Sequence, residues 1–127
     1  MSTSENRFIG VWHLRKFLES SQKELDAEVG AVEEATGLLI YTYDGFVSVS
    51  MLHPALGFMG YSGRWEVDGS VVLNHIDVCS RADWIGQTQR REMNVDGMVL
   101  TVSAHRTEDD GSTIDRTLVW ERSSRER

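Results

Sequence analysis

Hydrophobic and polar residues alternate along most of the chain in short runs that end at turn-forming residues. Four Asp-Gly pairs mark such points, at residues 44–45, 68–69, 96–97 and 110–111. Asp-Gly favours tight hairpins because both central residues of a type I′ turn need a positive φ. Reading outward from these turns predicts eight strands, at roughly 7–19, 36–43, 46–52, 59–67, 70–79, 86–95, 98–105 and 114–122.

Short turns between consecutive strands predict an all-β, up-and-down antiparallel meander. Such strands close into a single β-barrel, which removes exposed edges and holds packed side chains or one small ligand. The polar segment 20–35 is expected to form either a loop with a short helix or a ninth strand, and 80–85 a helical turn. The 127 residues fit this one domain, with frayed tails at 1–6 and 123–127.

Composition and charge exclude several classes of function. The net charge is −7 and the basic residues are scattered, so a nucleic-acid partner is not expected. The N-terminus has no secretory signal pattern, and no apolar run approaches the ~20 residues of a membrane-spanning helix. The one cysteine, Cys79, excludes a disulfide within the chain and is interpreted as a buried, inert thiol. These features favour a cytoplasmic protein with no membrane partner.

The hairpin at 96–97 predicts which side chains face the barrel interior. With two residues in the turn, Val95 lies opposite Met98, and one face gathers mostly apolar residues. That face consists of Gln89, Arg91, Met93, Leu100, Val102 and Ala104. Arg91 is therefore expected to point inward, where a guanidinium needs a partner. Two interpretations stay open: a structural pair with an internal carboxylate, or a contact with a carboxylate, carbonyl or enolate of a ligand.

The hairpin at 44–45, taken as a two-residue turn, also separates two faces. The expected core face consists of Leu38, Ile40, Thr42, Val47, Val49 and Met51. The opposite face is unusually aromatic, with Tyr41, Tyr43 and Phe46, and is expected to contact segment 20–35 or a second subunit.

The hairpin at 68–69 allows two registers, and each reverses every side chain of the following strand. A two-residue turn directs inward the residues Ser70, Val72, Asn74 and Ile76. A three-residue turn with a bulge directs inward the residues Leu73, His75 and Asp77. We favour the second register, in which His75 faces the interior.

Several local patterns point to a known family. Gly10-Val11-Trp12 is a Gly-x-Trp of the kind that opens lipocalin barrels, and residues 61–69 (YSGRWEVDG) form a Tyr-x-Gly-x-aromatic-x-Val-Asp-Gly hairpin. Residues 37–45 (GLLIYTYDG) and 118–122 (LVWER) match a second and a closing strand. Together with the stretch from His75 to Arg91, they resemble the short bacterial lipocalin-like domain family over nearly the whole chain.

The resemblance implies a β-barrel, but barrels of this shape host carriers and enzymes alike. It also implies that Arg122 stacks over Trp12 and closes one end of the barrel. Asp83 departs from the pattern, because the family often has a proline there, and this leaves the conformation of 80–85 open.

Candidate chemistry centres on an interior acid–base group. His75 could transfer a proton, with Asp77 orienting its ring, while Arg91 stabilises an oxyanion. The alternative is a histidine that hydrogen-bonds to a neighbour such as Tyr61. No spacing of histidines indicates a metal site, and neither a phosphate loop nor a nucleophilic-serine turn is present, so no cofactor is expected.

Three hypotheses follow. The first is a barrel that binds a small, largely apolar molecule, polyketide- or terpenoid-like, with a carbonyl or carboxylate. The second is a cofactor-free isomerase, cyclase or dehydratase that uses His75 and Arg91. The third is a filled barrel that acts as a homodimerisation module. The expected ligand contacts in the first two are Tyr61, Trp65, Trp84, Gln89 and Trp120.

Overall fold

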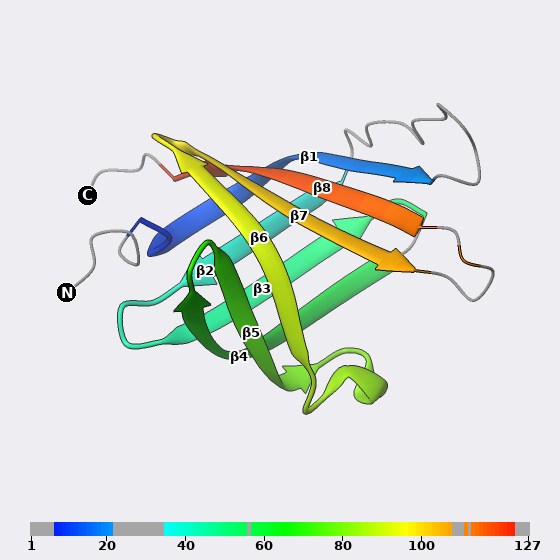
Figure 1. The fold of residues 1–127 in the computed structure, drawn as a ribbon, viewed down its shortest axis with the longest axis horizontal. Helices are drawn as coiled ribbons and strands as arrows, with labels where there is room; N and C mark the ends of the chain where they lie inside the picture. Colours follow the sequence, from blue (N-terminus) through cyan, green and yellow to red (C-terminus); the bar gives the residue numbers. More distant parts are fainter. Residues whose placement is uncertain (1–6, 22–34, 56, 108–110, 112, 124–127) are drawn as a thin grey trace.

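The computed structural model describes residues 7–21, 35–55, 57–107, 111 and 113–123. Within this part of the chain, eight antiparallel strands form one closed barrel in sequence order (Figure 1). The strands are β1 (Gly10–Ser21), β2 (Thr36–Tyr41), β3 (Phe46–His53), β4 (Gly57–Asp68), β5 (Val71–Cys79), β6 (Thr88–Asp96), β7 (Val99–Thr107) and β8 (Thr113–Arg122).

The all-β barrel and its strands are confirmed close to the predicted bounds. A short 3₁₀ helix, η1 (Ala82–Trp84), connects β5 to β6 where a helical turn was expected. Most of segment 20–35 lies outside the described residues, as do 1–6 and 124–127. No helix in the described part of the chain is long and apolar enough to cross a membrane.

One end of the barrel is closed by Trp12 and Arg122. The Trp12 ring is fully buried, its Nε1 donates to the carbonyl of Phe8 at 3.0 Å, and the Arg122 guanidinium lies 4.2 Å from the ring centroid. Arg122 also donates to the carbonyls of Ile9 at 2.8 Å and Arg7 at 2.7 Å. The predicted cation–π contact is confirmed, and its hydrogen bonds tie the N-terminal chain to β8.

The predicted interior face of β6 and β7 is confirmed. Val95 pairs with Leu100, and Met93 with Val102, so the loop residues are Gly97 and Met98. This register is displaced by two residues from the predicted one. Because side chains alternate with a period of two, such a displacement leaves every side chain on the same face.

The prediction for the face of β2 is wrong, because the 44–45 hairpin has three loop residues and not two. The backbone N–H of Thr42 donates to Phe46 at 2.8 Å, which leaves residues 43–45 as the loop. Gly45 takes a φ of +99° there, as in a type I turn followed by a bulge. Leu39 and Tyr41 are therefore buried, and Leu38 is exposed on the outer face.

The preferred register at the 68–69 hairpin is also wrong. Asp68 pairs with Val71, so the loop has two residues, and the bulge lies farther along, where Ser62 pairs with Val78 and Gly63 with Ile76. The residues of β5 that turn inward are Val72, Asn74 and Ile76, and all three are buried. His75 and Asp77 consequently face outward.

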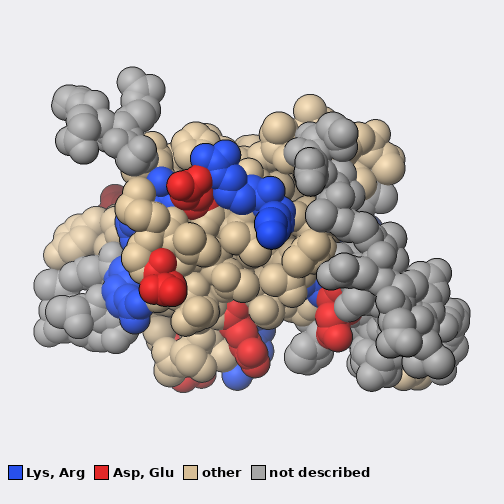
Figure 2. Space-filling view, turned by 90° about the horizontal axis from the view of Figure 1, so that it is seen from above, with Lys and Arg blue, Asp and Glu red and all other residues tan. Residues whose placement is uncertain are grey.

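Interior side chains are buried to different degrees along the barrel. On β6, Val95 is buried in the same core cluster as Trp12 and Trp120, whereas the inward-facing residues Met93, Arg91 and Gln89 are half-buried. We call the Gln89 end of the barrel the open end. Figure 1 shows η1 toward this end and both chain termini toward the other. On the outer surface shown in Figure 2, acidic and basic side chains are interspersed.

Candidate functional site

Arg91 is the charged group at the centre of the interior site. It lies on β6 beside Val72 of β5 and is half-buried. Its Nη1 donates to the carbonyl of Arg90 at 3.0 Å, and its Nη2 donates to Oε1 of Gln89. Among the described residues, no carboxylate lies within ion-pair distance of this guanidinium. Burial lowers the pKa of Arg91, as expected for a cation taken partly out of water.

Asn74 links two buried tyrosines across the interior. The hydroxyl of Tyr41 donates to Oδ1 of Asn74 at 3.3 Å, and Nδ2 of Asn74 donates to the hydroxyl of Tyr61 at 3.1 Å. Burial raises the pKa of both tyrosines, so both stay neutral. In this arrangement the hydroxyl of Tyr61 accepts a hydrogen bond, and its own proton has no acceptor among the described residues.

Tyr61 and Arg91 act on the same part of the interior. The positive charge of Arg91 lowers the pKa of Tyr61, against the larger opposite effect of burial. Tyr61 bonds to Asn74, which pairs with Gln89, the residue to which Arg91 donates. The two groups therefore present donors to one region, from the strands on either side of β5. A neutral phenol O–H and a guanidinium together suit a carboxylate or carbonyl oxygen.

The predicted aromatic contacts divide between the interior and its rim. Trp65 is half-buried, packs edge-on against Tyr41 with ring centroids 5.5 Å apart, and donates from Nε1 to the carbonyl of Thr42 at 3.0 Å. Trp120 is only 2% exposed, and its Nε1 has no hydrogen-bond partner in the part of the chain that the structure describes. Trp84 of η1 is half-buried against the core, with the Arg81 guanidinium 4.8 Å from its ring.

Two polar residues at the open end were missed by the sequence reasoning. Arg116 of β8 lies opposite Ala104, faces inward, and places its guanidinium 5.4 Å from the Phe17 ring. Its charge adds to the lowering of the Arg91 pKa. The ring of His53 of β3 lies edge-on to the Phe17 ring, with the two centroids 5.3 Å apart. Extending the apolar alternation of β3 and β8 by one further step would have found both.

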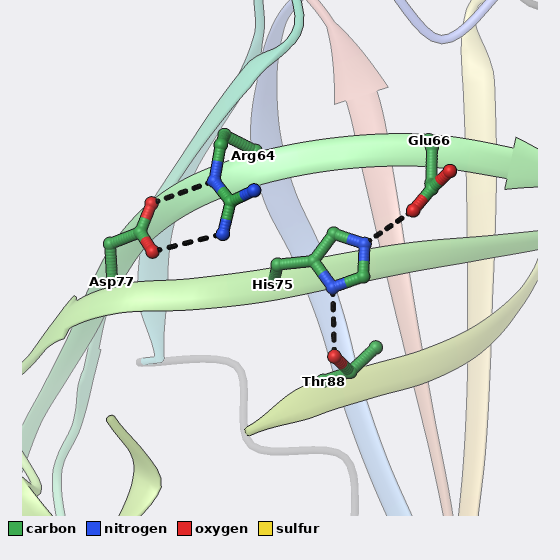
Figure 3. A network of polar contacts seen from close by, with 5 residues as sticks. All are labelled: Arg64, Glu66, His75, Asp77 and Thr88. Atoms are coloured by element: carbon green, nitrogen blue, oxygen red, sulfur yellow. Dashed lines mark hydrogen bonds and ion pairs between the residues drawn. The ribbon is translucent and has the colours of Figure 1, made fainter. Parts of the chain in front are cut away.

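His75 and Asp77 lie on the outer face of β5, where they contact residues of β4 and β6 (Figure 3). Nε2 of His75 lies 2.6 Å from Oε2 of Glu66, and Nδ1 lies 2.8 Å from the hydroxyl of Thr88. Asp77 accepts two hydrogen bonds from Arg64, at 3.1 and 3.2 Å. Hydrogen bonding from Arg64 holds the pKa of Asp77 below its usual range. The expected His75–Asp77 pair is absent, because each residue bonds to a different partner on β4.

Two further predictions concern the burial of Cys79 and metal binding. Cys79 is half-buried, not buried as expected, and its Sγ accepts from the backbone N–H of Arg81 at 3.4 Å. Within the described ranges, no three His, Cys, Asp or Glu side chains come together as metal ligands.

A shallow hollow of about 350 Å³ lies on the outer face of β2–β5, separate from Arg91 and Tyr61. It is mostly apolar, and the residues around it are Ile40, Thr42, Phe46, Val47, Ser48, Ser62, Gly63, Asp77 and Val78. Phe46 and Val78 are more than half exposed there. Tyr41, which was expected to contribute to an outer aromatic patch, is instead buried in the core.

Comparison with known proteins supports the fold. No curated protein matches the chain. A crystal structure of a lipocalin-like protein from Bacteroides uniformis is similar, with 12% identity, a TM-score of 0.54, and coverage of 92% of this chain and 99% of that chain. An uncharacterized protein from Bacteroides eggerthii is similar at 10% identity and a TM-score of 0.52, over 91% of this chain and 99% of that one.

At these identities the two structures show a shared fold alone. The family assignment comes from the sequence, because the model of the lipocalin-like domain matches residues 53–123, more than half of the chain. The chain belongs to the lipocalin-like domain family.

Proposed function

We propose that the barrel binds one small, largely apolar molecule whose carboxylate or carbonyl oxygen is held by Arg91 and Tyr61. A lipocalin-like barrel is consistent with small-molecule binding. The observation that carries the proposal is the inward guanidinium of Arg91, which has no carboxylate partner among the described residues. A desolvated cation is costly until an anion or a strong acceptor meets it, and a ligand oxygen fills that role.

The surroundings of Arg91 suit the rest of such a ligand. Next to it along the interior face are Met93, Val102 and Leu118, which are buried or half-buried apolar residues. Ala104, the next inward residue of β7 after Val102, pairs with Arg116 and adds a small apolar side chain to this wall. An acid with an apolar body, whether polyketide-like, terpenoid-like or a medium-chain fatty acid, matches this division into a polar end and an apolar wall.

The catalytic and dimeric alternatives find less support. An isomerase, cyclase or dehydratase that uses His75 as base needs His75 and Arg91 to reach one ligand, yet they lie on opposite sides of the sheet. The dimer hypothesis depended on an aromatic outer patch that included Tyr41, which is buried. Binding without proton transfer by His75 is therefore the function that we propose.

The Arg91→Gln variant is expected to bind decanoic acid roughly 10- to 100-fold more weakly than the native protein, because it loses a charge-assisted contact. Isothermal titration calorimetry measures this directly. Arg90→Gln is the matched control, since Arg90 is the next residue on β6 and its side chain is exposed on the outer face. We expect its affinity to equal that of the native protein.

Decanol provides a second control, because it has the same apolar body and no carboxylate. The affinity for decanol should be low and should change little between native protein and Arg91→Gln. The proposal fails if both arginine variants reduce the affinity for decanoic acid equally. It also fails if the native protein binds decanoic acid no more tightly than decanol.

A further inference from the structure

Trp120 carries a buried hydrogen-bond donor that the protein leaves unused. The side chain is 2% exposed, and Nε1 has no partner, alone among buried side-chain polar atoms in the described residues. By contrast, the indole N–H groups of Trp12 and Trp65 both donate to backbone carbonyls at 3.0 Å. A buried donor without an acceptor is unfavourable, and protein structures rarely leave one so.

Trp120 of β8 lies deeper in the barrel than Arg91 of β6, and both face the interior on either side of β7. Trp120 pairs with Leu100, which pairs with Val95 of β6. Arg91 is four residues before Val95 on β6, toward the open end. Four residues of strand span about 13 Å. Arg91 also bonds back to Gln89, so its guanidinium is directed away from Trp120.

The wall between these two donors is apolar. Met93, Val102 and Leu118 form the intermediate level, since Met93 pairs with Val102 and Val102 with Leu118. A ligand that runs along this wall therefore meets a cationic donor at the open end, an apolar middle, and a single neutral N–H at the closed end.

From this arrangement we infer that the ligand is an acid with a second oxygen acceptor at its far end. This inference rests on the proposed function, because it places the carboxylate on Arg91 and Tyr61. The second oxygen is a neutral acceptor such as a ketone, which accepts a hydrogen bond from the N–H of Trp120. A ketone has no donor of its own that would be left unpaired in the core. An extended chain of about ten carbons, with a hydrogen bond of about 2.9 Å at each end, is long enough to cover a span of about 13 Å or somewhat more.

The test compares two acids that differ only at the far end, 9-oxodecanoic acid and decanoic acid. Native protein should bind the keto acid about tenfold more tightly by calorimetry, because only that ligand satisfies the buried N–H. In Trp120→Phe, which removes the N–H, the preference should disappear or reverse. Equal affinities of the native protein for the two acids would overturn the inference.

A second measurement uses the native protein alone and so does not depend on how well Trp120→Phe folds. In an ¹⁵N-labelled sample, the keto acid should shift the indole N–H signal of Trp120 downfield, and decanoic acid should not. The indole signals of Trp12 and Trp65, already bonded to carbonyls, are the internal controls. If the Trp120 signal responds alike to both acids, the ligand does not reach this donor through an oxygen.

The two proposals fail in distinguishable ways. If neither acid binds, or binding does not depend on Arg91, the proposed function itself is wrong. If both acids bind through Arg91 with the same affinity, the function stands and only the second acceptor is wrong.

Discussion

The Gly63→Ala variant is expected to lose on the order of 3 kcal/mol or more of its free energy of unfolding. A Cβ at this position would lie 1.7 Å from the backbone oxygen of His75 and 2.8 Å from its carbonyl carbon. Both atoms belong to the main chain of β5, so no side-chain rotation can relieve the clash. The two strands would have to separate at the bulge, where Gly63 pairs with Ile76.

Urea denaturation of native and variant protein measures this effect. Gly60→Ala is the matched control, because Gly60 lies on the same strand and its added Cβ would be 2.8 Å from the Phe58 ring. Phe58 is 61% exposed and can rotate away, and the Val49 backbone oxygen, at 3.1 Å, needs to give by only a few tenths of an ångström, so the control should lose about 1 kcal/mol or less. Similar losses in the two variants would show that β4 and β5 do not approach each other so closely at Gly63.

The Asn74→Ala variant is expected to be destabilised by about 2–4 kcal/mol, from lost hydrogen bonds and a cavity. Asn74 is 2% exposed and bonds to the hydroxyls of Tyr41 and Tyr61. Without the amide, two buried phenols lose their shared partner. The hydrogen bond from Asn74 to the Tyr61 hydroxyl, which leaves the Tyr61 proton available to a ligand, is also lost. Ligand affinity should therefore fall together with stability.

Asn94→Ala on β6 provides the comparison, since Asn94 is exposed and should tolerate alanine within about 0.5 kcal/mol. The same urea titrations apply to both asparagine variants. If Asn74→Ala proves as mild as Asn94→Ala, the Tyr41–Asn74–Tyr61 chain does not stabilise the interior.

Strand positions were predictable because the alternating pattern and the Asp-Gly turns agree along the chain. The face of β6 was also predictable, since an error of two residues in the turn keeps Arg91 on the inner side. The Trp12–Arg122 contact followed from the resemblance to the family. These features depend on the alternation of inward and outward residues along a strand or on short motifs. Both can be read directly from the sequence.

The faces of β2 and β5 were not predictable in the same way, because each depends on whether a turn has two or three residues. Asp-Gly is compatible with both loop lengths. The extra loop residue after Thr42 buries Tyr41, and the shorter turn after Asp68 turns Asn74 inward and His75 outward. One residue in each loop therefore decides that the interior polar groups are tyrosine and asparagine, and not histidine and aspartate.

The central claim is that the ligand lies inside the barrel against Arg91, and a titration of ¹⁵N-labelled protein with decanoic acid tests it most directly. If the ligand binds there, the Nε–H signal of Arg91 and the side-chain amide signal of Gln89 shift with ligand concentration, together with the backbone signals of β6. The outer hollow on β2–β5 offers the competing location. Shifts confined to Phe46, Ser62 and Val78 around that hollow, with Arg91 and Gln89 unchanged, would show that the ligand binds outside the barrel.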